Sequence, residues 1–300
     1  MKILITGGTT FVSKYTAEYF TKKGNDVFVL NRGRKKQADG VKLIKCDRKQ
    51  SGDTLKGMHF DLIIDVVAYT ADDIKALTDS GVSFGDYFFI SSSAVYPETN
   101  PQPFNESQPC GPNSIWGDYG TNKLAAEKLL LEKVPDAYIL RPPYLYGIYE
   151  NLYRELFLFD CAAQDRKFFL PHNGNMKLQF FNVSDLCRFI EVLIEKHPSC
   201  HIFNVGNRET VSVKEWAELC YSIAGKTPEF VSVDKVVPQR SYFCFHNYEY
   251  VLDVSRQYEL MPETLPLEQG LKEEYEWYIS TPDHEYVHRP YMEFIDNELK

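Results

Sequence analysis

The chain begins MKILITGGTTFVSKYTAEYF (residues 1–20), and the segment TGGTTFVS at residues 6–13 decides the fold. Three apolar residues before this segment predict a buried strand, and the apolar residues within and after it recur at helical spacing. Gly7 and Gly8 stand between the two elements. A strand, a tight turn and a helix in this order aim backbone N–H groups and the positive helix end at a pyrophosphate. The segment therefore predicts a dinucleotide-binding turn.

This turn departs from the usual three-glycine pattern, because Thr10 and Ser13 stand where the second and third glycines are expected. Thr10 adds a Cβ near the expected path of the pyrophosphate, whereas Ser13 is small enough for the helix to stay close to the sheet. We interpret the site as altered rather than lost. The residues assigned to the cofactor in this turn are Gly7, Gly8, Thr10 and Phe11.

Composition and charge exclude several classes of protein. The chain has 300 residues, a formal net charge of -9 and a sequence pI near 5.4, and a general nucleic-acid or membrane-surface binder would need a dominant basic face instead. Seven cysteines lie scattered without a CxxC pair, which is typical of reduced thiols. No leader-like segment precedes the first strand, and no apolar run reaches the roughly 18 residues of a membrane span. We expect a cytoplasmic protein without a membrane partner.

Strand-like segments alternate with helical or polar stretches through the first half of the chain, and several are apolar on both faces. This pattern predicts an α/β fold with a Rossmann-type, doubly wound parallel sheet. We expect a dinucleotide-binding domain over residues 1–165, with segments at about 178–205 returning to it, and a smaller substrate-binding lobe over 166–300. The predicted early strands lie at 26–31, 42–46, 61–67 and 86–91.

Tyr119 and Lys123 in the segment DYGTNK stand four residues apart near the start of a predicted helix, so they project from one face. A lysine ammonium one turn away favours the phenolate, which would lower the pKa of Tyr119 and suit it to acid/base catalysis. Spacing alone does not decide the matter. Tyr19 and Lys23 share the same spacing on the first helix, where we expect Tyr19 to pack in the core.

Ser92 follows the predicted strand DYFFIS, and the carboxyl ends of parallel strands face the ligand crevice. Its hydroxyl is suited to bind a substrate oxygen while a proton moves to or from Tyr119. The alternative is that Ser91, Ser92 and Ser93 only terminate the strand.

Three segments, TGGTTFVS, SSSAVY and YGTNK, in this order and at these separations, resemble the extended short-chain dehydrogenases/reductases of the NAD-dependent epimerase/dehydratase group. The opening turn is similar to the GGTRF-type turn of one branch. The resemblance covers residues 1 to about 147 well. It implies that Ser92, Tyr119 and Lys123 are the catalytic residues, that Lys123 also holds the nicotinamide ribose, and that hydride passes between the cofactor and a sugar carbon.

The resemblance also implies further contacts and an assembly. Asp47 would contact the adenine, although an exposed loop aspartate is the alternative. A homodimer would form through helices that flank the sheet, including the helix that carries Tyr119. The remaining cofactor positions are Ala68 and Pro142, and the substrate positions are Tyr69, Ser93, Tyr144 and Gln179.

Two departures from the family pattern concern the reaction. Ser93 and Ala94 replace the Asp-Glu pair of the sugar-nucleotide dehydratases, which disfavours dehydration. Tyr144 and Leu178 or Gln179 stand where many sugar-nucleotide epimerases have an asparagine and an arginine. Positive charge for a phosphate could still come from Lys177, Arg154 or Arg240, although each is more often a surface charge.

Nucleotide preference depends on the end of the second predicted strand. Asn31 stands where NAD binders usually place an acid, and Arg32 follows it. Loss of the carboxylate and gain of a guanidinium favour a 2′-phosphate, so NAD(P) is the expected cofactor, with NADP slightly preferred. The alternative is a solvated basic loop.

The histidines and cysteines lack the spacing of metal ligands, and we predict no metal site. The sequence therefore predicts an NAD(P)-dependent sugar or sugar-nucleotide epimerase or reductase. The alternative is a catalytically weak or inactive nucleotide-binding protein of the same fold, regulatory or RNA-associated like some relatives of the GGTRF-type branch. The acidic charge makes nucleic acid an unlikely partner.

Overall fold

The opening segment forms strand β1 (Lys2–Thr6) and helix α1 (Phe11–Lys22), as its apolar pattern predicts. We describe a computed structural model of residues 1–300. Residues Ile3, Leu4 and Ile5 of β1 are completely buried, because β1 lies inside the sheet with helices on both faces.

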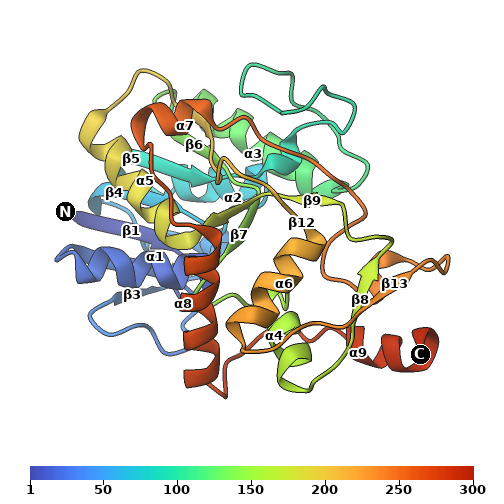
Figure 1. Cartoon of the computed structure of the whole chain (residues 1–300). Coiled ribbons are helices and arrows are strands. Elements are labelled where there is room, and N and C mark those ends of the chain that lie inside the picture. The colour runs from blue at the N-terminus through green and yellow to red at the C-terminus, as the bar shows by residue number, and fades with distance from the viewer.

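Seven parallel strands form the central sheet, in the order β11-β6-β5-β4-β1-β2-β3 (Figure 1). Strands β1 to β6 lie in the order 3-2-1-4-5-6, which is the strand order of a doubly wound nucleotide-binding fold, and β11 extends the sheet beyond β6. This architecture confirms the predicted fold class. The other strands of the sheet are β2 (Asp26–Asn31), β3 (Lys42–Lys45), β4 (His59–Asp65), β5 (Ser83–Ile90), β6 (Tyr138–Arg141) and β11 (Ile202–Asn204).

Strand β4 ends two residues before its predicted end, for a local reason. The Thr6 hydroxyl accepts hydrogen bonds from the backbone N–H groups of Val66 and Val67, at 3.0 and 3.2 Å. The same hydroxyl donates to Asp65 at 2.6 Å. The chain therefore leaves the strand ladder directly beside the end of β1, where the strand order reverses and a crevice is expected.

Helices cover both faces of the sheet. Apolar side chains of α1 and α5 pack on one face, and those of α2 and α3 pack on the other. The segment after β6 returns to the sheet through α5 and β11. These helices are α2 (Ala71–Thr78), α3 (Asp118–Lys133) and α5 (Val183–Lys196).

A second lobe lies beside the sheet and has its own aromatic core around Trp216 (Figure 1). Helix α6 begins with a capping box, the pattern of Ser212 and Glu215 that is visible in the sequence. Helix α4 precedes the predicted boundary at residue 165 but packs with α6 and α8. The helices outside the sheet layer are α4 (Glu155–Ala163), α6 (Val213–Ile223), α7 (Ser255–Leu260), α8 (Leu267–Ser280) and α9 (Tyr291–Phe294).

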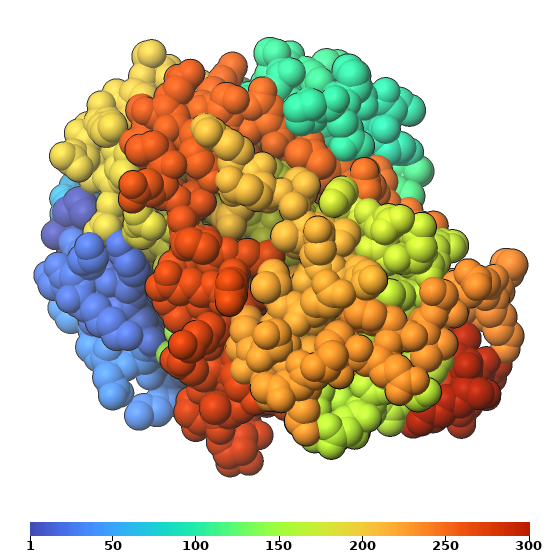
Figure 2. All heavy atoms as spheres, in the orientation of Figure 1, coloured from blue at the N-terminus to red at the C-terminus, as the bar shows by residue number.

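Three two-stranded ribbons complete the structure, and their strands are too short to be visible as sequence periodicity. The C-terminal segments lie across the junction of the two lobes on the face that Figure 2 shows. None of the helices combines the length and apolar character of a membrane span. The ribbons pair β7 (Tyr144–Tyr146) with β10 (Phe180–Asn182), β8 (Phe168–Pro171) with β13 (Phe230–Val233), and β9 (Lys177–Leu178) with β12 (Val211–Ser212).

Candidate active site

The turn between β1 and α1 needs both of its glycines. Gly7 and Gly8 each have a φ of +95°, which side chains rarely tolerate. A Cβ on Gly8 would lie 2.4 Å from Cγ1 of Val29, so β2 closes the space beneath the turn. The φ angles and the packing against β2 therefore exclude larger residues at these two positions.

The first turn of α1 keeps its N–H groups free of side-chain caps. Thr10 occupies the N-cap position, but its side chain makes no capping hydrogen bond. Ser13 is buried, and its hydroxyl donates to the Thr10 carbonyl at 2.9 Å instead. Phe11 has a φ of +35°, an uncommon conformation for a residue with a side chain. The turn thus offers backbone donors and a positive helix end to an anion.

One cavity of about 460 Å³ joins this turn to the predicted catalytic residues. Thr10 and Phe11 line the cavity on the α1 side. Ser92, Tyr119 and Lys123 line it on the other side, at the carboxyl end of β5 and the start of α3. Thr10 and Lys123, which are 113 positions apart in sequence, therefore line the same cavity.

Gly120 brings Tyr119 close to Ser92. A Cβ on Gly120 would lie 2.3 Å from the Ala94 carbonyl oxygen, so only glycine lets α3 pack against the segment that follows β5. In that segment, the Ser92 hydroxyl accepts a hydrogen bond from the Ala94 N–H at 3.1 Å. The hydroxyl retains its own proton for another partner.

Lys123 lies beneath the cavity and is almost completely buried. Its Nζ donates to the carbonyls of Ala68 and Ile90, each at 2.8 Å. An ammonium carries three hydrogens, so one remains after these two bonds. Burial lowers the pKa of Lys123 to about 8, and the nearby Asp65 and Glu127 carboxylates offset part of this effect.

The structure corrects the expected effect of Lys123 on Tyr119. Burial raises the pKa of the Tyr119 phenol to about 12, and a hydrogen bond with Ser92 offsets only part of the increase. The residue as a whole is 42% exposed, so the burial that matters is that of its hydroxyl end. The sequence prediction of a lowered pKa was wrong because it considered the charge of the lysine but not the desolvation of the phenol.

The predicted substrate residues fall into two groups. Tyr69, Ser93 and Tyr144 line the cavity, and the Tyr69 ring centroid lies 6.5 Å from that of Tyr119. Gln179 does not line it. Its amide instead bonds the backbone of Asn207 and Leu252, at 2.8 Å to each, and so joins loops of the second lobe.

The predicted nucleotide residues at the end of β2 lie outside the cavity. The Asn31 amide donates to the Gly7 carbonyl at 2.7 Å, and its oxygen accepts from the Gly33 N–H at 2.8 Å. Arg32 is exposed beside it. Asp47 is also exposed, and its side chain accepts from the Lys49 N–H at 3.1 Å.

The two backbone positions assigned to the cofactor lie against the catalytic residues. Ala68 is buried, and its carbonyl oxygen accepts a hydrogen bond from the Lys123 ammonium. Pro142 lines the cavity, and its carbonyl accepts from the Ser93 N–H at 3.0 Å.

A buried ion pair supports the end of β4 below the cavity. The Arg48 guanidinium donates to both oxygens of Asp65, at 2.9 and 2.8 Å, and lowers the pKa of that carboxyl despite its burial. Tyr87 donates to the same carboxylate at 2.6 Å. Together with Thr6, these contacts fix the crevice where the strand order reverses.

Sequence reasoning missed most of the cavity wall that the second lobe supplies. Arg154 and Arg240, for which the sequence left a phosphate contact or a surface charge open, both line the cavity, and Arg154 is only 8% exposed. These residues come from segments without a local motif, so only the fold brings them together. The other lining residues that were missed include Trp116, Phe245, His246, Tyr250 and Arg289.

Comparisons with known proteins identify two curated relatives. One is the chloroplast stem-loop binding protein of 41 kDa b from Arabidopsis thaliana, 27% identical over 250 residues, which are 77% of this chain and 65% of the relative. Another is the probable GDP-L-fucose synthase 1 from Oryza sativa subsp. japonica, 27% identical over 213 residues, which are 64% of this chain and 61% of the relative. The chain thus spans less than two thirds of either relative.

A solved structure shows the same fold. The UDP-glucuronic acid 4-epimerase from Bacillus cereus, in complex with NAD, superposes with a TM-score of 0.73 at 18% identity and covers 93% of this chain and 99% of its own. The model of the NAD dependent epimerase/dehydratase family matches residues 3–80 and 62–206. The chain therefore belongs to the NAD dependent epimerase/dehydratase family.

Proposed function

We propose that this protein is an NAD(P)-dependent enzyme that oxidises or reduces a carbinol carbon of a sugar or sugar nucleotide, as an epimerase or a reductase. One observation carries the proposal. Ser92, Tyr119 and Lys123 line the same cavity as the uncapped start of α1. Membership of the family supports this reaction class.

The residues around the turn fit a dinucleotide. Backbone N–H groups at the start of α1 would hold the pyrophosphate, because no side chain caps them. The remaining hydrogen of the Lys123 ammonium would bind the nicotinamide ribose, since its other two are used by backbone carbonyls. When bound, the cofactor supplies hydride exchange with the substrate carbon.

Tyr119 would exchange the proton. Its raised pKa keeps the phenol protonated at neutral pH, so it can donate a proton to a carbonyl oxygen during reduction and recover it during oxidation. Ser92 would hold that oxygen through its hydroxyl proton. Lys123 then acts as an anchor and a fixed positive charge beneath the site.

The second lobe supplies the charges that would meet an anionic substrate. Arg154, Arg240 and Arg289 line the cavity, which suits a substrate with phosphate or carboxylate groups. The name of the rice relative, GDP-L-fucose synthase, supports a nucleotide sugar. The position of Gln179 outside the cavity means that any such substrate would be bound by other residues.

NADP(H) remains our preferred cofactor because no carboxylate follows β2 in the expected place. Asn31 is held by backbone bonds, and Arg32, the next residue, is exposed. We expect Arg32→Ala to weaken NADPH by about tenfold and NADH by much less. Equal losses for both nucleotides would remove the 2′-phosphate role.

The decisive experiment is a titration of the purified protein with NADPH and with NADH, followed by energy transfer from protein to nicotinamide. We expect micromolar binding, retained by Tyr119→Phe, and turnover of a nucleotide-linked keto sugar that this variant loses. If the protein binds neither NADPH nor NADH, the proposal is overturned. A tightly retained nucleotide after purification would indicate an epimerase, because an epimerase returns its hydride.

The chloroplast relative favours a second candidate function, namely RNA binding by the same fold. The net charge of -9 opposes it, because RNA affinity depends on neutralising phosphates. A stem-loop RNA shifted in a gel at low salt by this protein, without any NAD(P)H binding, would favour the RNA function. A homodimer through α3 is a further part of our proposal and would be checked by sedimentation.

A further inference from the structure

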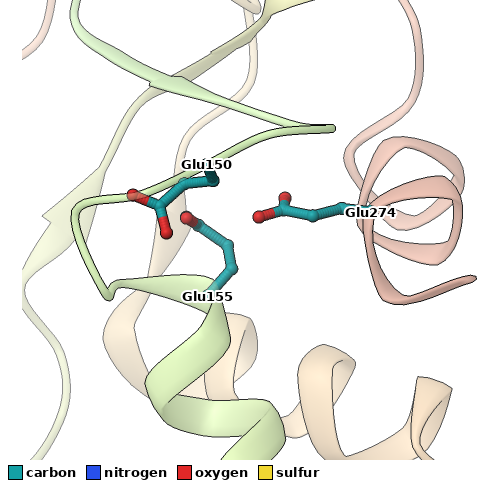
Figure 3. Close-up of side chains that lie close together, drawn as sticks. All are labelled: Glu150, Glu155 and Glu274. Carbon is teal, nitrogen blue, oxygen red and sulfur yellow. The ribbon is translucent and has the colours of Figure 1, made fainter. Parts of the chain in front are cut away.

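Two glutamates close in sequence and a third from a distant helix meet inside the second lobe. Glu150 lies in the loop after β7, Glu155 begins α4 and Glu274 lies on α8. All three are completely buried, and one carboxylate oxygen from each lies within 4.8 Å of the others. Figure 3 shows that the three side chains point toward one another. Exposed acidic groups often gather without consequence, but fully buried ones require compensation.

The hydrogen bonds of this cluster are incomplete. Glu150 accepts from the backbone N–H groups of Leu152 and of Arg154, and Glu274 accepts from the Gly147 N–H at 3.1 Å. Both oxygens of Glu155 and the second oxygen of Glu274 have no hydrogen-bond partner. Glu155 is thus a fully buried carboxylate without a hydrogen bond, aimed into the centre of the cluster (Figure 3). Such oxygens indicate a missing positive ligand.

Arg154 supplies only part of the required positive charge. Its Nε lies 3.7 Å from Glu150 and 3.9 Å from Glu155, and it makes no hydrogen bond to either. Its Nη2 donates to the Leu145 carbonyl. If all three carboxylates were ionised beside one guanidinium, two negative charges would remain in a fully buried site. One divalent cation would neutralise them.

We propose that Glu150, Glu155 and Glu274 bind a hard divalent cation of the Ca²⁺, Mg²⁺ or Mn²⁺ class. The ligands are carboxylate oxygens only, which these cations prefer, whereas zinc and copper prefer imidazole or thiolate. Oxygens on opposite sides of such a cation lie roughly 4 to 5 Å apart, which the observed limit of 4.8 Å allows. No local spacing marks this site in the sequence, because Glu274 lies more than 100 residues after Glu150 and Glu155.

A cation here would stabilise the lobe and release Arg154. It would join α8 to the start of α4 and to the loop before it, in addition to the Gly147–Glu274 bond, the Tyr278–Asp160 bond and the packing of α4 on α8. Arg154 also lines the cavity. With the carboxylates neutralised by the cation, its guanidinium would be available to an anion there. Without the cation, burial raises the pKa of all three glutamates, so they would share protons instead.

The test uses the full-length protein after treatment with a chelator. We expect calorimetric titration with CaCl₂, MgCl₂ or MnCl₂ at pH 7.5 to show one site per chain for at least one cation. Saturation with that cation should raise the melting temperature by roughly 4 °C or more, since a ligand that binds only the folded state stabilises it. EPR of bound Mn²⁺ would confirm oxygen coordination.

The Glu155→Gln variant distinguishes two explanations of the cluster, namely a bound cation and protons shared among the three glutamates. The carboxamide keeps the size of the side chain but removes its charge, so we expect at least a tenfold loss of affinity. Glu268→Gln, on the exposed side of α8, is the matched control and should bind as the wild type does. Wild-type protein that binds none of the three cations, or Glu155→Gln that binds with unchanged affinity, would overturn the proposal. If Glu155→Gln fails to fold, the wild-type titration alone decides.

Discussion

Two tyrosine–lysine pairs with the same spacing lie in very different surroundings. Tyr19 and Lys23 lie where α1 packs against α5, and both contact the Glu191 carboxylate of α5, at 2.5 and 3.3 Å. Tyr119 and Lys123 lie on α3, where the lysine is buried beneath a cavity and bonded to backbone carbonyls. Helical spacing places each pair on one face, but the packing around the pair decides what it can do.

The comparison also shows why a nearby positive charge alone is a poor guide to the pKa of a tyrosine. Both tyrosines have raised pKa values, chiefly because of burial, although each has a lysine one turn away. What distinguishes Tyr119 is its neighbours. Ser92 and an open cavity adjoin it, whereas the Tyr19 hydroxyl is occupied by an ion pair between helices.

The largest expected difference between the pairs is in turnover. Tyr119→Phe should lower kcat by about 10²- to 10⁴-fold, because it removes the proton-transfer group, and should leave cofactor affinity nearly unchanged. Tyr19→Phe should change kcat by less than about twofold. Steady-state kinetics with NADPH and a keto sugar would measure both. Comparable rates for Tyr119→Phe and wild type would refute the catalytic assignment.

The lysines should differ in cofactor binding as well as in rate. Lys123→Met removes the ribose contact and the charge beneath the site, so we expect about a tenfold loss of NADPH affinity and a 100-fold loss of kcat. Lys23→Met, with its side chain 52% exposed, should bind NADPH as the wild type does. Fluorescence titration of both variants is the measurement. A Lys123→Met variant with intact affinity would contradict the ribose role.

Lys123 should also give stability a pH dependence. Its pKa is about 8 in the folded protein and near 10.5 in the unfolded chain. Between these values the unfolded state binds more protons, so the free energy of unfolding should rise with pH across this window. We expect wild type to gain stability relative to Lys123→Met between pH 7.5 and 9.5, measured by urea denaturation. A difference that stays constant or falls would be inconsistent with a buried, destabilised ammonium.

The smallest effect should come from the acid that joins the first pair. Glu191→Gln keeps the side-chain size but removes the charge that Tyr19 and Lys23 contact. Partly exposed ion pairs contribute little, so we expect a loss below about 1 kcal/mol in urea denaturation and no change in kcat. A loss of several kcal/mol would mean that the contacts of Glu191 with Tyr19 and Lys23 stabilise the fold more than their exposure predicts.

Much of the fold could be predicted because local patterns determine it. Continuous apolar runs predicted β1 and β2 to within one residue, and the Ser212 and Glu215 capping box marked the start of α6. The family resemblance is confirmed by the family model. The roles of Ser92, Tyr119 and Lys123 stay predictions, although the structure brings all three to one cavity.

Other features could not be predicted because they depend on contacts between distant segments. Burial sets the pKa of Tyr119, and sequence spacing contains no information on how deeply a phenol is desolvated. The cluster of Glu150, Glu155 and Glu274 has no local signature, since α8 must fold back against α4 to form it. The family resemblance placed Leu178 or Gln179 at a substrate position, whereas the Gln179 amide bonds the backbone of the second lobe instead.

The path of the chain between the lobes limits how this protein could be divided. The chain leaves the sheet after β6, builds half of the second lobe, returns for α5 and β11, and leaves again. No single cut yields two fragments that each contain a whole core, because the edge strand lies between the two halves of the lobe. A shortened version that ends after β6 would lack β11 and α5, exposing the apolar side chains that they cover. Exchange of substrate lobes between relatives would therefore require two transplanted segments rather than one.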